Sequence, residues 1–108
     1  MEVGKMAIID ISIVPVGTST PSVSRFVAGA VKILQNEPDI KYQLTPMNTV
    51  IEGDLEHLLA LAKKMHDSAF NSGIQRVVTT LRIDERRDKP LTMTGKVEAV
   101  KKQLDQGE

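Results

Sequence analysis

Glu52 is the first residue whose type and position could do chemistry. It lies in the stretch LTPMNTVIEGD, residues 44–54, where a carboxylate interrupts a segment rich in β-forming residues. A carboxylate in such a place can accept hydrogen bonds from a ligand amine or ring N–H. The alternative is a structural role, in which Glu52 favours the N-terminus of the helix that follows. The residues alone leave both interpretations open.

The turn before Glu52 offers further groups that could bind a ligand. The hydroxyls of Thr45 and Thr49 can donate and accept hydrogen bonds, and Met47 can form an adaptable apolar wall against a flat ring. Ordinary turn chemistry also accounts for these residues, because Pro46 and Asn48 favour turns and threonine favours strands.

Basic and acidic residues alternate in the run RIDERRDK, residues 82–89. Its three arginines could bind a phosphate or sulfate group. Its three acidic residues neutralise the same stretch, so ion pairs at a solvated strand end are the commoner explanation.

The sequence lacks the residue patterns that are typical of catalytic sites, metal sites and nucleic-acid-binding surfaces. The chain has no cysteine, and its two histidines, His57 and His66, do not have the i, i+4 spacing of a metal-binding helix face. No serine has an evident base beside it. The 14 basic and 14 acidic residues cancel, and aromatic residues make up only 3%. A binding role without catalysis and without a cofactor fits best, and no nucleic-acid partner is expected.

The chain is expected to be a cytoplasmic protein with no membrane partner. No apolar run approaches the roughly 20 residues that a spanning helix needs. The start, MEVGKMAIIDISI, lacks the shape of a signal peptide. The length of 108 residues fits a single domain, residues 1–108, with a small core.

Hydrophobic periodicity predicts the elements that position these residues. The first predicted elements are a strand over 6–14 that ends at Pro15 and a helix that is capped by Thr20 and stops near residues 36–37. Two short strands, 40–47 and 48–53, are followed by a helix between Asp54 and Gly73 with Leu58 and Leu59 on its apolar face. The last predicted elements are a strand over 74–90 and a helix over 91–106 that is capped by Thr92 or Thr94. This βαββαβ order, followed by a helix, is the ferredoxin-like α+β arrangement. It predicts a four-stranded antiparallel sheet with two helices on one face.

The second face of that sheet would be left uncovered. It would carry Met6, Ile8, Val14 and Val78, which is too apolar for exposure to water over such an area. Packing of this face against another copy is the natural solution, so a homodimer or homotetramer is expected.

Four segments together resemble the thiamine-binding protein family of the YkoF-like superfamily: SIVPVGTSTPSVSRFVA, LTPMNTVIEGD, RVVTTLRIDERRDK and TMTGKVEAVKKQL. The specific part is Pro-Met-x-Thr-x-x-Glu-Gly combined with Arg-Ile-Asp-x-Arg. The resemblance implies a ferredoxin-like fold and dimers that pair through their sheets into a tetramer. It also implies non-catalytic binding of thiamine or its hydroxymethylpyrimidine half, for salvage, transport or sensing.

The resemblance also implies where the ligand would bind. Carried over by motif, the candidate ligand-binding residues are Ser12, Thr45, Met47, Thr49, Glu52, Arg82 and Asp84. Hydroxyls and a carboxylate in a mostly apolar pocket could satisfy the polar atoms of an aminopyrimidine. The alternative function is a regulatory or assembly protein that acts through oligomerisation of its sheet face, with no dedicated ligand.

Overall fold

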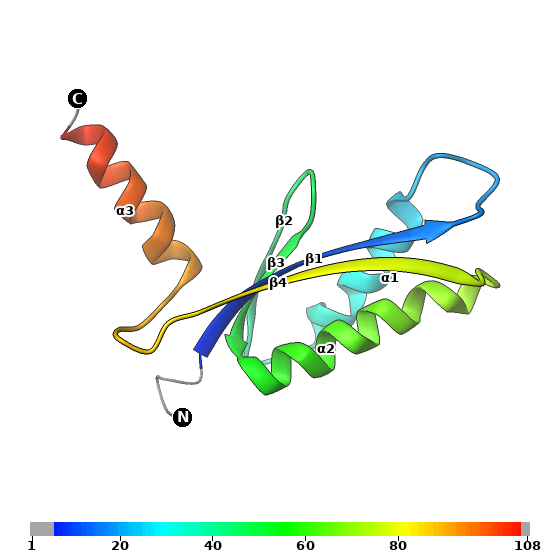
Figure 1. Ribbon diagram of the computed structural model, residues 1–108, viewed down its shortest axis with the longest axis horizontal. Coiled ribbons are helices and arrows are strands. Elements are labelled where there is room, and N and C mark those ends of the chain that lie inside the picture. Colours follow the sequence, from blue (N-terminus) through cyan, green and yellow to red (C-terminus); the bar gives the residue numbers. More distant parts are fainter. Residues whose placement is uncertain (1–5, 107–108) are drawn as a thin grey trace.

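The structure is a computed structural model that describes residues 6–106 (Figure 1). Its elements are β1 (Met6–Val16), α1 (Ser24–Gln35), β2 (Lys41–Leu44), β3 (Thr49–Asp54), α2 (Leu55–Ser68), the 3-10 turn η2 (Ala69–Ser72), β4 (Arg76–Glu85) and α3 (Met93–Asp105). The four strands form one antiparallel sheet in the order β2-β3-β1-β4. The predicted βαββαβ fold with an additional C-terminal helix is therefore confirmed.

The two faces of the sheet follow the alternation along β1. Ile9, Ile11 and Ile13 face the helices and are buried, and Ile9 lies opposite Ile51 of β3. Helices α1 and α2 cover this face (Figure 1). Their buried core residues are Phe26, Ala30 and Leu34 from α1, with Leu58, Leu61, Ala62 and Met65 from α2. The opposite face is not covered by either helix, as predicted, and is called the open face below.

Three predicted boundaries match the structure closely. Asp54 caps α2, and its carboxylate accepts a hydrogen bond from the His57 N–H at 3.3 Å. Gly73 follows η2 with a left-handed φ of 82°, which glycine adopts without steric cost. Thr92, rather than Thr94, caps α3, and its hydroxyl accepts a hydrogen bond from the Gly95 N–H at 2.9 Å.

The predicted end of β1 at Pro15 is wrong. The strand continues to Val16, and Pro15 lies opposite Val77 in the ladder with β4. Pairing with β3 has already stopped at Ile11 opposite Thr49, so from that point the β3 side of β1 is a strand edge. A proline that needs no hydrogen bond on that side is tolerated there.

The predicted start of α1 is also wrong. The helix begins at Ser24 after Val23, with no side-chain cap. The Thr20 hydroxyl accepts a hydrogen bond from the Ser22 N–H at 3.3 Å, so it orders the loop before the helix instead of capping it. On α2, Leu59 is 38% exposed and Leu61 is buried in its place.

Helix α3 stands apart from the two-layer body (Figure 1). None of its residues is buried, and Val97, Val100 and Leu104 are 52, 60 and 73% exposed. No helix of the described residues 6–106 is long and apolar enough to cross a membrane.

Candidate functional site

The structure divides the seven predicted site residues between two places. Ser12, Thr45, Met47 and Thr49 line a hollow of about 170 Å³, called the turn hollow below. Arg82 and Asp84 line a groove of about 590 Å³ between the open face and the start of α3, called the α3 groove below. Glu52 is buried on the open face, near α3 and away from the turn hollow.

The turn hollow lies where β3 begins and its neighbour β1 runs on alone. The β1–β3 ladder stops at Ile11 opposite Thr49, whereas β1 remains paired with β4 up to Val16. Beyond Ile11, the edge of β1 that faces away from β4 therefore has no strand partner. Residues of β1 from Ile11 to Val14 line the hollow, so backbone N–H and C=O groups of an unpaired edge are available there.

The remaining walls of the turn hollow are mostly apolar. Val23, Val27 and Ala30 come from α1 and its N-cap, and Met65 comes from α2. Met47 lies at the tip of the β2–β3 turn and is 85% exposed. A flexible thioether at the mouth of an apolar hollow can move against the face of a bound ring.

The three hydroxyls at the turn hollow are in different states. Thr45 is engaged within the turn, because its hydroxyl lies 2.7 Å from Asn48 Oδ1 and accepts the Asn48 N–H at 3.1 Å. Thr49 is 4% exposed, and neither its hydroxyl nor that of Ser12 bonds to another described residue. Thr49 lies opposite Ile11 and faces the helices, whereas alternation along β1 places the Ser12 side chain on the open face with Val14. Thr49 is thus the hydroxyl left for a ligand in the hollow, Ser12 lines the hollow through its place on the edge of β1, and turn chemistry accounts for Thr45.

Glu52 has a partner that neither interpretation of the sequence anticipated. Its Oε1 accepts a hydrogen bond from the backbone N–H of Met93 at 2.7 Å. Met93 is the first residue of α3, so the carboxylate lies at the positive end of that helix. The helix directly after Glu52 is capped instead by Asp54.

Charged groups in the α3 groove are paired across elements. Arg82 Nε donates a hydrogen bond to a carboxylate oxygen of Asp10 at 2.9 Å, and this bond to the Asp10 carboxylate raises the pKa of Arg82. Lys96 Nζ lies 2.8 Å from Asp84. Further along the run, the hydrogen bond from Arg86 lowers the pKa of Asp88 to about 2. The ion-pair interpretation of residues 82–89 is therefore confirmed for these members.

Sequence reasoning missed several residues of both sites. Asp10 and Lys96 complete the ion pairs of the α3 groove, and Val23 and Val27 form a wall of the turn hollow. For the α3 groove, the sequence did offer one signal: Asp10 is a charged residue on the side of β1 that also carries apolar residues such as Ile8 and Val14. Within residues 6–106, no three histidine or acidic side chains gather as metal ligands.

The sequence pattern of the thiamine-binding protein family matches residues 9–101. The chain belongs to the thiamine-binding protein family. It is 54% identical to the UPF0045 protein YqgV of Bacillus subtilis (strain 168), over 92% of this chain and 98% of that protein. The resemblance in sequence is thereby confirmed over nearly the whole chain.

Two solved structures place this thiamine-binding protein family member among known folds. A hypothetical protein from Methanocaldococcus jannaschii superposes with a TM-score of 0.83 at 35% identity, covering 92% of this chain and 99% of that chain. A candidate thiamine biosynthesis/salvage protein from Thermotoga maritima has a TM-score of 0.74 at 22% identity, covering 88% and 98%. The second likeness, at that identity, concerns the fold alone.

Proposed function

We propose that the chain binds thiamine, or its hydroxymethylpyrimidine half, in the turn hollow and releases it chemically unchanged. The observation that carries the proposal is the unpaired edge of β1, from Ser12 onward, beside the free hydroxyl of Thr49. Membership in the thiamine-binding protein family supports the same ligand class. Salvage, transport and sensing would all be served by such binding.

An aminopyrimidine complements the polar groups of the turn hollow. Its ring nitrogens accept hydrogen bonds and its exocyclic amine donates them. The backbone edge of β1 presents both donors and acceptors, and the hydroxyl of Thr49 can do either. The apolar side chains of Val27 and Met47 can lie against the two ring faces.

The size of the turn hollow limits how much of the ligand enters it. Its 170 Å³ is below the roughly 300–1,000 Å³ of pockets that enclose drug-sized ligands. One ring therefore enters, and the thiazolium ring and any phosphate remain at the mouth beside Met47. No carboxylate is among the described residues that line the hollow, so the cationic thiazolium gains no ion pair there.

Isothermal titration calorimetry with hydroxymethylpyrimidine, thiamine and thiamine phosphates tests the proposal. Because recognition resides in the pyrimidine, all should bind with affinities within about one order of magnitude of each other. Absence of heat with every one of them at millimolar concentration would contradict the proposal. Recovery of a chemically altered ligand would show an enzyme instead.

The open face supports a second proposal, self-association into a homodimer or homotetramer. Val14 and Val78 lie opposite each other on this face and are 47 and 46% exposed. Apolar side chains on an uncovered sheet face favour packing against another copy. If the calorimetry shows no ligand while the chain still associates, the chain is better described as an assembly or regulatory protein.

A further inference from the structure

The direction of the main-chain groups in the sheet can be read from the end of the β2–β3 hairpin. The Thr45 N–H donates a hydrogen bond to the Asn48 carbonyl at 2.9 Å, so these two residues form a hydrogen-bonded pair. In an antiparallel ladder, hydrogen-bonded and non-hydrogen-bonded pairs alternate along the strands. Gln43 and Val50, two positions further along, are therefore also a hydrogen-bonded pair. The main-chain groups of Val50 thus point toward β2.

The same alternation continues from β3 to β1. The N–H and C=O of one strand residue point to the same side, and those of the next residue point to the opposite side. Because Val50 points toward β2, Thr49 points toward β1, where it lies opposite Ile11. Ile11 and Thr49 therefore form the last hydrogen-bonded pair of the β1–β3 ladder. Along β1, odd-numbered residues point their main-chain groups toward β3, and even-numbered residues point theirs toward β4.

Two odd-numbered residues of β1, Ile13 and Pro15, lie beyond the end of that ladder. They are in register with Thr79 and Val77 of β4, but their main-chain groups point to the opposite, unpaired edge. Pro15 has no N–H and leaves only a carbonyl there. The place of this proline supports the assignment, because a missing donor interrupts no ladder on an unpaired edge. Ile13 leaves both an N–H and a C=O at the edge, and it lines the turn hollow.

The residue that would pair with Ile13 has turned away from it. If the register of the β1–β3 ladder continued, Met47 would lie opposite Ile13. The chain turns at Pro46 and Met47 instead, where the Met47 N–H donates to the Thr45 hydroxyl at 3.2 Å. The Met47 side chain is 85% exposed. The turn hollow therefore lies where a strand residue would otherwise exchange hydrogen bonds with Ile13.

We propose that the main chain of Ile13 selects the ligand, and that the ligand class is planar rings with an amine next to a ring nitrogen. This inference rests on the proposed function and deepens it. The ring nitrogen accepts the Ile13 N–H, and the adjacent amine donates to the Ile13 C=O. An aminopyrimidine thereby forms the two hydrogen bonds that an opposing strand residue would form.

The two main-chain groups discriminate between closely related pyrimidines. A ring without the amine leaves the Ile13 C=O unpaired, and sites built to form a hydrogen bond strongly reject analogues that lack it. The Ile13 side chain is 8% exposed and belongs to the hydrophobic core, so core packing fixes the position of its main chain. Such preorganised groups do not move to adapt to a poorer partner.

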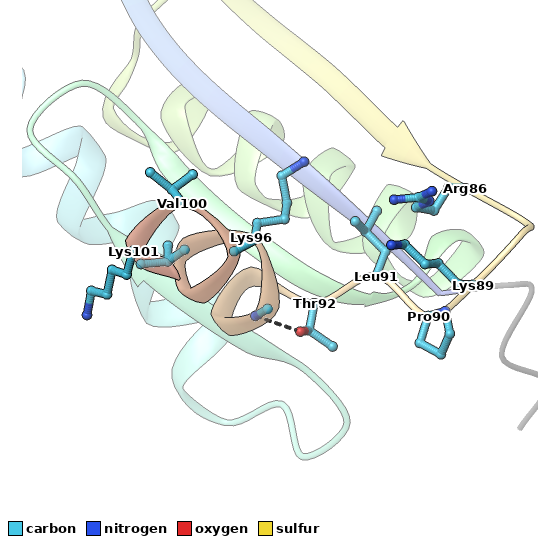
Figure 2. A pocket seen from close by; sticks show the side chains of 11 residues that line it. Arg86, Lys89, Pro90, Leu91, Thr92, Lys96, Val100 and Lys101 are labelled. Carbon is cyan, nitrogen blue, oxygen red and sulfur yellow. Dashed lines mark hydrogen bonds between the residues drawn. The ribbon is translucent and has the colours of Figure 1, made fainter. Parts of the chain in front are cut away.

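A larger hollow beside α3, called the basic hollow below, favours a different chemistry. It has a volume of about 810 Å³ and lies between α3 and the segment that connects it to β4. Four basic side chains line it: Arg86, Lys89, Lys96 and Lys101 (Figure 2). Its Gly95 N–H is bonded to the Thr92 hydroxyl at 2.9 Å, as the dashed line in Figure 2 shows. Basic side chains attract anions, so a neutral aminopyrimidine gains little there, and Val100 in this hollow is an internal control.

The first test compares two ligands by calorimetry: hydroxymethylpyrimidine and the analogue in which hydrogen replaces the amine. The analogue should bind about tenfold more weakly or worse, because it leaves the Ile13 C=O without a donor. Equal affinities would overturn the role of Ile13 and leave the proposed function standing. Absence of binding by both molecules at millimolar concentration would overturn the proposed function and this inference together.

The second test compares Ile13→Pro with Ile13→Val. Both variants have three side-chain carbons, but only proline lacks the N–H. Because that N–H points to the unpaired edge, Ile13→Pro should keep the fold, which thermal unfolding checks. Its affinity for hydroxymethylpyrimidine should be about tenfold lower than that of Ile13→Val, because the ring nitrogen loses its donor. Equal affinities of two folded variants would overturn the proposal.

The third test uses the unmodified chain and therefore does not depend on the folding of a variant. Without ligand, the Ile13 amide should exchange its hydrogen faster than the Ser12 and Val14 amides, which point toward β4. Saturating hydroxymethylpyrimidine should slow the exchange at Ile13 about tenfold or more and leave that at Val100 unchanged. An unchanged rate at Ile13 with the ligand bound would overturn the proposal and leave ligand binding itself established.

Discussion

The carboxylate of Glu52 accepts a hydrogen bond at 2.7 Å from the backbone N–H of Met93, which lies 41 residues further along the chain. Glu52 is 6% exposed, so this bond lies in a setting of low dielectric and little water. It ties the open face of the sheet to the first turn of α3. The role of Glu52 in the structure is therefore to position a distant helix.

Glu52→Ala should loosen α3 without weakening ligand binding. Removal of a hydrogen bond to a charged group costs about 1.5–3 kcal/mol, and here it also leaves the Met93 N–H without its acceptor. Hydrogen exchange should show faster exchange of the first amides of α3, with Glu56→Ala on exposed α2 surface as the control. A fall in hydroxymethylpyrimidine affinity of more than tenfold, with α3 still protected, would assign Glu52 to the ligand.

Thr49→Val should weaken ligand binding with little change in fold. The substitution keeps the shape of a buried side chain and removes the hydroxyl that has no partner in the described chain. A net hydrogen bond is worth about 1 kcal/mol, so the affinity for hydroxymethylpyrimidine should fall about fivefold by calorimetry. An unchanged affinity would remove Thr49 from the proposed site.

Thr45→Val should do the reverse of Thr49→Val: it should lower the stability of the fold and leave the ligand affinity nearly unchanged. The Thr45 hydroxyl bonds within the turn to Asn48, so its loss should lower the free energy of unfolding by about 1 kcal/mol. Urea denaturation measures this change. Ligand affinity should stay within about twofold as long as the turn remains formed, and a selective loss of affinity without destabilisation would show a direct contact of Thr45 with the ligand.

Leu61→Ala should destabilise the protein much more than Leu59→Ala, although the two leucines are neighbours on α2. Leu61 is 1% exposed and Leu59 is 38% exposed. A buried Leu→Ala substitution costs about 2–5 kcal/mol, because a cavity remains. Denaturant midpoints compare the two variants, and equal midpoints would contradict the packing of α2 described above.

The pKa of Asp88 should be about 2 and should rise when its partner is removed. The hydrogen bond from Arg86 holds the Asp88 carboxyl below its ordinary value of 3.8. A lowered pKa in the folded state means that the pair stabilises the fold above pH 4 and that this contribution is lost as the pH falls toward 2. In an NMR titration, Arg86→Gln should return the pKa of Asp88 toward 3.8, and an unchanged value would show that the pair does not form in solution.

The order of strands and helices could be predicted because hydrophobic periodicity and capping residues lie within each element's own segment of the sequence. Alternation at Ile9, Ile11 and Ile13 identified the buried side of β1, and Asp54 identified the start of α2. The end of β1 could not be found in this way. Pro15 is tolerated because the pairing of β1 with β3 ends at Ile11 opposite Thr49, and that depends on the register between the two strands.

The candidate sites were harder to predict because they depend on distant segments. The motif around Thr49 correctly identified the turn hollow's polar residues as neighbours, but not the wall contributed by α1. Glu52 lies only three residues after Thr49 in the same strand. Because side chains alternate along a strand, Thr49 faces the helices and Glu52 faces the open face. Its partner Met93 could not be inferred, since the direction of α3 is set by the connection after β4.

The central claim is that a pyrimidine ring binds in the turn hollow, and backbone NMR of the labelled protein titrated with hydroxymethylpyrimidine tests it most directly. Large shift changes are expected for Ile13, Met47 and Thr49, with Glu52 and Met93 nearly unchanged. Large changes at Glu52, Arg82 and Asp84, with none around Thr49, would contradict it and place the ligand in the α3 groove instead.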